Sequence, residues 1–150
     1  MTNYELLLKQ LESVLSIETD PVSNMANTAA VLFNSLDNLN WAGFYVLKKG
    51  GLVLGPFQGK PACVRIALGK GVCGTAAKTG QTQRVEDVHQ FPGHIACDSA
   101  SQSEIVVPIF KNGAVWGVLD IDSPVLARFG VAEQTFFEQV GRIFTTYSQL

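Results

Sequence analysis

Charged residues, histidines and cysteines are all scarce in this sequence. The few and scattered basic residues argue against a nucleic-acid partner. Charged residues make up 16% of the 150 residues, and the formal net charge is -2. Lysines and arginines are scattered, with no run longer than Lys48-Lys49. Duplex-binding modules concentrate basic residues on one face or along one helix. We therefore expect no nucleic-acid partner.

The chain also lacks a long hydrophobic run and a recognisable secretory leader. No apolar stretch approaches the roughly 20 residues that span a bilayer. Met1–Glu5 shows no basic segment leading into an apolar run with a small-residue cleavage site. An odd number of cysteines, 3, does not suit a secreted disulfide framework. We expect no membrane partner and a cytoplasmic location, where resting thiols stay reduced.

Apolar residues, by contrast, are plentiful and regularly spaced. They make up 47% of the chain, and its length of 150 residues suits one domain over residues 1–150. Helical spacing predicts two helices within the first 40 residues, separated at Asp20-Pro21, and a last helix over Val131–Ser148. The apolar N- and C-terminal helices could serve either the core or a homodimer interface, and the sequence leaves both open.

The middle of the chain has the alternating pattern of strands. Strands are expected at Trp41–Val46, Leu52–Leu54, Cys63–Ala67, Gln81–Val85, Ile105–Phe110 and Ala114–Ile121, with a short helix at Cys73–Lys78. Turns at Lys49–Gly51 and Asn112-Gly113 predict hairpins. The sequence therefore predicts an α+β domain whose sheet has about six strands, is mainly antiparallel and is covered by the terminal helices. Residues 86–104 form a long polar connection of the kind that often carries function.

Three acids adjoin the two most regular strands. Asp120 and Asp122 are two residues apart, so both carboxyls project from one face of a strand. Glu104 precedes the partner strand of the hairpin and can lie near Asp120. Clustered carboxyls raise one another's pKa if they are buried. The alternative is an ordinary solvated strand face.

Two aromatic residues share the face of an earlier strand. Trp41 and Tyr45 flank Gly43, and a glycine there leaves room for something to approach the sheet. For such aromatic residues, a place in the hydrophobic core is the simpler interpretation.

The cysteines offer redox or metal chemistry. Cys63 and Cys73 fit the usual role of a buried apolar residue, whereas Cys97 lies in the polar connection, where its pKa can be tuned. Cys63, Cys73, His94 and Cys97 could also form a zinc site, although the usual short cysteine pairs are missing. His89 and His94 are otherwise expected to be solvated loop residues.

The segments around these residues resemble the free methionine-(R)-sulfoxide reductases, a family built on a GAF domain. The resembling segments are Trp41–Tyr45, Gly55–Ile66, Gly69–Gly74, Pro92–Asp98, Ser103–Pro108 and Gly117–Pro124. All three cysteines of the family are present. A generic GAF domain would not be expected to combine these cysteines with these acids.

The resemblance implies a role for each candidate residue. Cys97 looks like the thiolate that attacks the sulfoxide, Cys63 like the principal resolving cysteine, and Cys73 like a further member of the relay. Glu104, Asp120 and Asp122 look like the acidic cluster that holds the substrate, and Trp41 and Tyr45 like pocket walls.

Sulfoxide chemistry adds detail to these roles. Asp122 and Glu104 would protonate or hydrogen-bond the sulfoxide oxygen, and Asp120 would meet the substrate ammonium. The substrate carboxylate would meet backbone N–H groups of Ile95, Ala96 and Cys97. We expect no metal and no cofactor, with electrons supplied by an external dithiol such as thioredoxin. The competing hypothesis is a non-catalytic GAF domain that senses a small molecule or oxidants.

Overall fold

The computed structural model describes residues 2–94 and 98–150. Its helices are α1 (Tyr4–Leu15), α2 (Pro21–Ser35), α3 (Gly71–Thr79), α4 (Val131–Tyr147) and the short 3₁₀ helix η1 (Val88–Gln90). Its strands are β1 (Trp41–Lys48), β2 (Gly51–Gly59), β3 (Arg65–Ala67), β4 (Gln83–Val85), β5 (Ser103–Lys111) and β6 (Ala114–Ser123). Among the described residues, no helix is long and apolar enough to cross a membrane.

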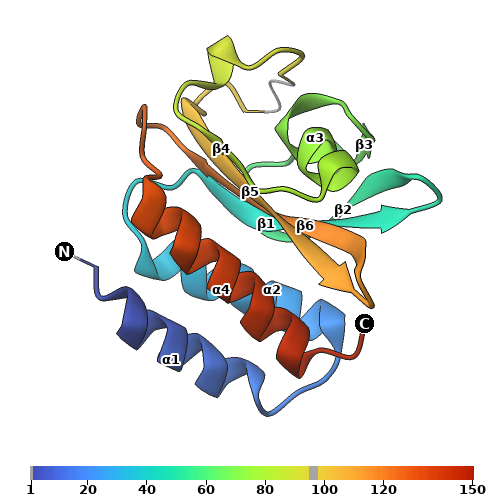
Figure 1. Cartoon of the computed structure of the whole chain (residues 1–150). Helices are drawn as coiled ribbons and strands as arrows, with labels where there is room; N and C mark the ends of the chain where they lie inside the picture. Colours follow the sequence, from blue (N-terminus) through green and yellow to red (C-terminus); the bar gives the residue numbers. More distant parts are fainter. Residues whose placement is uncertain (1, 95–97) are drawn as a thin grey trace.

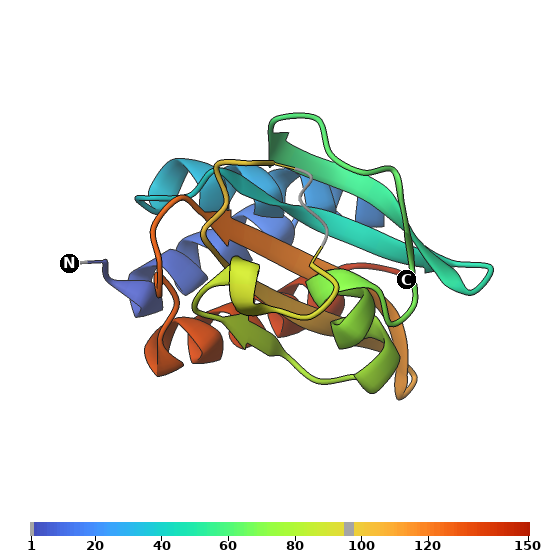
Figure 2. The same cartoon turned by 90° about the horizontal axis from the view of Figure 1, so that it is seen from above.

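The strands form one 6-stranded sheet in the order β3-β2-β1-β6-β5-β4. Each neighbouring pair is antiparallel. Helices α1, α2 and α4 cover one face, and α3 lies on the other (Figure 1). The view from above places η1 on the same face as α3 (Figure 2). The predicted α+β fold, with its antiparallel sheet of about six strands, is confirmed.

Local sequence signals explain where the first two helices begin. Asn3 caps α1 by accepting a hydrogen bond of 3.0 Å from the backbone N–H of Leu6. Asp20 caps α2 by accepting one of 2.9 Å from Ser23, and Pro21 occupies the first turn. Both arrangements satisfy backbone donors that a helix N-terminus otherwise leaves unpaired.

The two faces of the sheet bury different clusters. Leu119 and Ile121 of β6 pack under the α1, α2 and α4 helices, together with buried aromatic residues such as Phe44 and Phe144. A second cluster lies under α3 and includes Val106 and Val118. Because neighbouring residues of a strand point to opposite faces, Asp120 projects towards α3. The larger apolar core therefore forms on one face, and the other face combines a smaller apolar cluster with the acidic groups of β5 and β6.

Several element boundaries differ from the sequence prediction. Strand β2 continues to Gly59, well past the predicted end at Leu54, because Gly55 and Pro56 are poor strand formers and hide the pattern. Strand β3 begins only at Arg65, so Cys63 precedes it. Helix α3 begins at Gly71, two residues before the predicted start, since its glycines obscure the helical signal.

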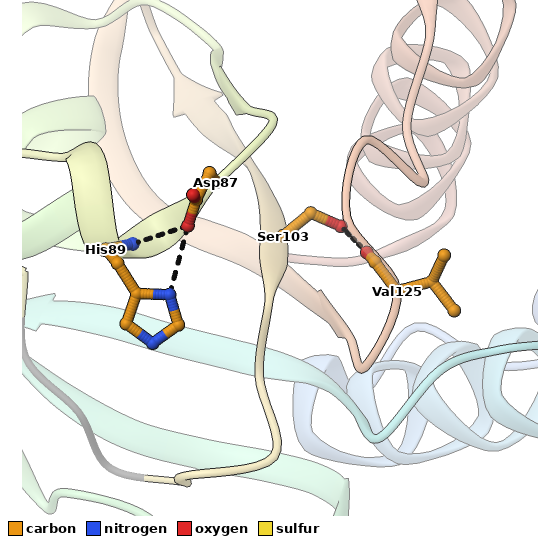
Figure 3. Close-up of polar contacts among 4 residues, drawn as sticks. All are labelled: Asp87, His89, Ser103 and Val125. Carbon is orange, nitrogen blue, oxygen red and sulfur yellow. Dashed lines mark hydrogen bonds and ion pairs between the residues drawn. The ribbon is translucent and has the colours of Figure 1, made fainter.

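The connection between β4 and β5 is held at both ends by polar contacts (Figure 3). At its start, the Asp87 carboxylate accepts a hydrogen bond from the backbone N–H of His89 and lies 3.0 Å from the ring nitrogen Nδ1. At its end, the buried Ser103 hydroxyl donates to the carbonyl of Val125, at 2.5 Å. This connection leads into the candidate site.

Candidate active site

A cavity of about 50 Å³ lies between the sheet and α3. Roughly 10–15 Å³ is enough for one water molecule, so the cavity can hold a larger polar group. Its lining joins aromatic, acidic and thiol side chains from distant parts of the chain: Trp41, Tyr45, Pro61, Ala62, Ile66, Lys70, Gly71, Val72, Cys73, His94, Asp98, Ser101, Glu104, Asp120 and Asp122.

Three carboxyl groups meet at the floor of this cavity. Glu104 of β5 lies directly opposite Asp122 of β6, and Val106 lies opposite Asp120. The Glu104 side chain is hydrogen-bonded to both aspartates. Glu104 is only 7% exposed and Asp120 only 5%, so the alternative of a solvated strand face is wrong. Since an ionised carboxylate only accepts hydrogen bonds, contacts within this acid triad require at least one bound proton.

Burial raises the pKa of all three carboxyls. Burial is the largest cause for Glu104, followed by the charges of Asp120 and Asp122, and its pKa lies well above the ordinary range. Burial and the charge of Asp120 likewise raise the pKa of Asp122 well above that range. Burial also raises the pKa of Asp120, although hydrogen bonds from Glu104, Cys73 and Asp122 oppose it. The triad therefore keeps protons that solvated carboxyls would lose.

Two oxygens of the triad are buried without a partner. Oδ1 of Asp120 and Oδ1 of Asp122 have no hydrogen-bond partner among the described residues. Buried polar atoms are nearly always satisfied, so such acceptors mark a place for a ligand that carries donors. The site is suited to a ligand that carries two features: a small cation or protonated amine, and next to it a group that accepts a proton.

Trp41 and Tyr45 form one wall of the cavity and are themselves buried. Their rings are stacked, with centroids 5.9 Å apart. The Trp41 indole donates to the carbonyl of Lys60 at 3.1 Å, and the Tyr45 hydroxyl donates to the carbonyl of Cys63 at 2.9 Å. The two aromatic residues belong to the core and line the cavity as well, and their polar atoms fix the segment that carries Cys63.

The expectation that Gly43 leaves room for an approaching group is correct, but the group comes from the neighbouring strand. A side chain at Gly43 would collide with Phe57 of β2 and with the Trp41 ring. The Phe57 and Trp41 rings are stacked, with centroids 5.1 Å apart. Gly43 therefore lets Phe57 support Trp41.

The cysteines differ in environment. Cys73, in the first turn of α3, is a free thiol that is buried and hydrogen-bonded to Asp120. Burial and the charge of Asp120 raise its pKa well above the ordinary range, so little thiolate forms there. Cys63 is partly buried and disulfide-bonded. Cys97, with Ile95 and Ala96, lies outside the described residues.

The grouping of potential metal ligands differs from the one considered from the sequence. Within the described part of the chain, ligand atoms of Cys73, Glu104 and Asp120 lie within 4.8 Å of one another. His94 and Cys63 are not members of this group, and a cysteine in a disulfide offers no thiolate to a metal. The four-residue zinc set therefore gains no support from the described residues.

Sequence reasoning misplaced one histidine and overlooked several polar residues. His94 lines the cavity, and burial lowers its pKa, so its prediction as a solvated loop residue is wrong. His89 is exposed beside Asp87, as expected. The Asn40 amide donates to Asp98 and to Ser101, each at 3.0 Å, at the cavity edge. Each contact joins residues about 60 positions apart, so no periodic pattern in the sequence could predict it.

Comparisons with known proteins agree with the fold and with the resemblance in sequence. A model of the GAF domain family matches residues 10–145. The free methionine-R-sulfoxide reductase of Escherichia coli is 55% identical over 126 residues, which cover 84% of this chain and 76% of that protein. The enzyme of the same name from Saccharomyces cerevisiae is 44% identical over 147 residues, covering 93% and 82%.

A solved structure extends the similarity to three dimensions. The free methionine-R-sulfoxide reductase of Neisseria meningitidis, in complex with its substrate, superposes with a TM-score of 0.93. It is 47% identical, and the alignment covers 96% of this chain and 87% of that one. The chain therefore belongs to the free methionine-(R)-sulfoxide reductases, a family built on the GAF domain.

Proposed function

We propose that this chain reduces free L-methionine-(R)-sulfoxide to L-methionine and that a disulfide formed in each cycle is reset by thioredoxin. Its family and its similarity to a substrate complex support the substrate. The observation that carries the proposal is the buried acid triad: Asp120 and Asp122 line the cavity, and each has an oxygen without a hydrogen-bond partner among the described residues.

The triad suits a zwitterionic substrate. The substrate ammonium would meet Asp120, whose pKa is raised less than those of its neighbours because hydrogen bonds from Glu104, Cys73 and Asp122 oppose the effect of burial. The methyl group of the sulfoxide would lie against the Trp41 indole. Backbone N–H groups of residues 95–97, which lie outside the described residues, would hold the carboxylate. A residue inside a peptide lacks both charges and would leave the acids unpaired, which explains a preference for the free amino acid.

The chemical step needs a proton for the sulfoxide oxygen. Glu104 and Asp122 are the donors, because burial keeps them protonated. The Cys97 thiolate attacks the sulfur, the oxygen passes to the cysteine, and methionine leaves with the electron pair on its sulfur. Cys97 is then a sulfenic acid, the reversible first product of thiol oxidation.

A second cysteine completes the cycle. The Cys63 thiol condenses with the sulfenic acid, a disulfide forms and water leaves. The disulfide-bonded state of Cys63 supports this role. Cys73 is the slower alternative, since burial raises the pKa of its thiol. An external dithiol restores the thiols, so the cycle uses neither metal nor cofactor and suits the reducing cytoplasm.

The decisive experiment is turnover with dithiothreitol. The purified protein is expected to consume free methionine-(R)-sulfoxide, to spare the S epimer and to ignore the peptide-bound sulfoxide. Cys97→Ser is expected to abolish turnover, with Cys73→Ser as the matched control that retains most of it. Ligand binding without turnover would favour a GAF sensor instead, and stoichiometric zinc in protein purified without chelator would favour a structural metal site.

A further inference from the structure

The small net charge of -2 conceals a strong asymmetry along the chain. Residues 38–85 contain seven of the 11 lysines and arginines and none of the 13 acids. Within the described part of the chain, ion pairs join Lys9 to Glu5 and His89 to Asp87, and none involves a basic residue of this segment. The segment that carries Cys63 and Cys73 is therefore basic, with its charges unpaired.

Four exposed residues of this segment follow Cys63 in the chain, and we name them the Cys63 rim: Val64, Arg65, Leu68 and Lys70, the last of which also lines the cavity. Val64 is 60% exposed and Leu68 is 37% exposed. Arg65 belongs to β3, the edge strand of the sheet, whose strand partner is β2. The Tyr45 hydroxyl and the backbone N–H of Leu54 fix the carbonyls of Cys63 and Val64, at 2.9 Å and 2.8 Å. The rim is thus a firm surface beside the disulfide-bonded cysteine.

We propose that the Cys63 rim docks an acidic protein dithiol, the reductant that resets the enzyme; this inference rests on the proposed function. A small dithiol has no use for exposed apolar side chains around its target. A protein reductant does, because docking interfaces bury apolar residues at their centre and place charges around them. The basic residues favour a partner of negative charge and speed its encounter.

The dithiol supplies all the electrons and protons that the exchange at this surface needs. One thiolate of the reductant attacks Sγ of Cys63, the enzyme disulfide breaks, and its electron pair leaves on the other enzyme cysteine, which takes up a proton. The second thiol of the reductant then attacks the mixed disulfide and releases Cys63 as a thiol. The reductant ends as a disulfide, and the enzyme gains two electrons and two protons.

The test compares two reductants at saturating sulfoxide. In Arg65→Glu, kcat/KM for a thioredoxin recycled by its NADPH-dependent reductase is expected to fall about tenfold and to lose much of its salt dependence. In Val64→Ser it is expected to fall about threefold. Turnover with dithiothreitol is expected to stay within about twofold of wild type in both variants, because neither side chain lines the cavity.

Matched control variants lie on the opposite side of the sheet, one in the turn after α1 and one on α1 itself. Ile17→Ser removes an apolar side chain that is 87% exposed, and Lys9→Glu reverses an exposed charge on α1. Both are expected to leave thioredoxin kinetics unchanged. Turnover with dithiothreitol, combined with unaltered thioredoxin kinetics in both rim variants, would overturn this inference and leave the proposed function standing. No turnover with dithiothreitol would overturn the proposed function and this inference together.

Discussion

Glu104 holds a proton because it lies at the start of β5, opposite Asp122 and buried beside both aspartates. Its carboxyl contacts both aspartates of the triad, and burial raises its pKa well above the ordinary range. A carboxyl whose pKa is raised on folding contributes stability that is complete below its ordinary pKa. That contribution is lost as the pH rises through the raised value. The residue that supplies the proton therefore destabilises the protein near neutral pH.

Glu104→Gln tests both consequences. The substitution keeps the size of the side chain and its ability to donate but removes the acid, so kcat/KM is expected to fall at least ~100-fold. Unfolding in urea at pH 5 and pH 8 is expected to show a gain of about 1–2 kcal/mol that is larger at the higher pH. Glu86→Gln, at an exposed position outside the triad, serves as the control. An equal gain at both pH values would contradict the raised pKa.

Tyr45 acts on Cys63 through one hydrogen bond of 2.9 Å to its carbonyl. Tyr45→Phe keeps the ring against the cavity and removes this bond, which is worth about 1 kcal/mol. The rate of disulfide formation in a single turnover is expected to fall about fivefold. Release of the first methionine, measured in the same experiment, should change less. Equal slowing of both steps would show that the hydroxyl serves the substrate rather than Cys63.

At the scale of elements, the β5–β6 hairpin is where the sequence was most informative. Asn112-Gly113 predicts the turn, and alternation correctly places Asp120 and Asp122 on one face and Leu119 on the other. Glu104 lies directly opposite Asp122 and also close to Asp120, as the hairpin predicts. Such local patterns specify which way a side chain points.

Burial of the acid face could not be predicted, since it depends on how α3 and residues such as His94, Asp98 and Ser101 pack around it. Helix α3 belongs to the connection between β3 and β4. No local sequence pattern predicts that this connection places α3 over the acids. The place of His94 on the cavity wall is a further example. Residues that a fold brings together over long sequence separations carry no periodic signal. The resemblance to a family indicated that Trp41 and Tyr45 join the acids, but it did not indicate His94.

Ser103 ties the start of β5 to the loop before α4 (Figure 3). Its hydroxyl donates to the carbonyl of Val125 and accepts from the backbone N–H of Arg128, at 3.3 Å. Ser103→Ala removes the partner of both backbone groups from a buried position at the start of β5 and is expected to cost about 1–3 kcal/mol in chemical unfolding. Ser13→Ala, on the exposed side of α1, should cost much less. A cost as small as that of the control would mean that water replaces the lost hydroxyl.

For the molecule as a whole, the two faces of the sheet have different roles. One face buries the core that stabilises the fold, and the other carries the groups proposed to act in catalysis. The apolar core lies between the sheet and the three covering helices, whereas the acids lie under α3. Neighbouring residues of β6 therefore serve different purposes, although they share one strand and one degree of burial.

Leu119 and Asp120 provide the comparison. Leu119→Ala opens a cavity in the core and is expected to cost about 2–5 kcal/mol in unfolding, with activity retained while the protein is folded. Asp120→Asn is expected to abolish tight binding of the substrate and to change stability by less than about 1 kcal/mol. Calorimetry and substrate titration on the two variants measure these effects. Comparable losses of stability in both would contradict the division between the two faces.

The edges of the sheet have a consequence for behaviour at high concentration. β3 and β4, the outermost strands, are each 3 residues long, and they carry the exposed Arg65 and Arg84. A short, charged edge is a poor template for strands of another molecule, whereas the long strands β1 and β6 are paired on both sides. The outermost strands thus disfavour the edge-to-edge joining that leads to amyloid-like aggregates, even when many copies are crowded together.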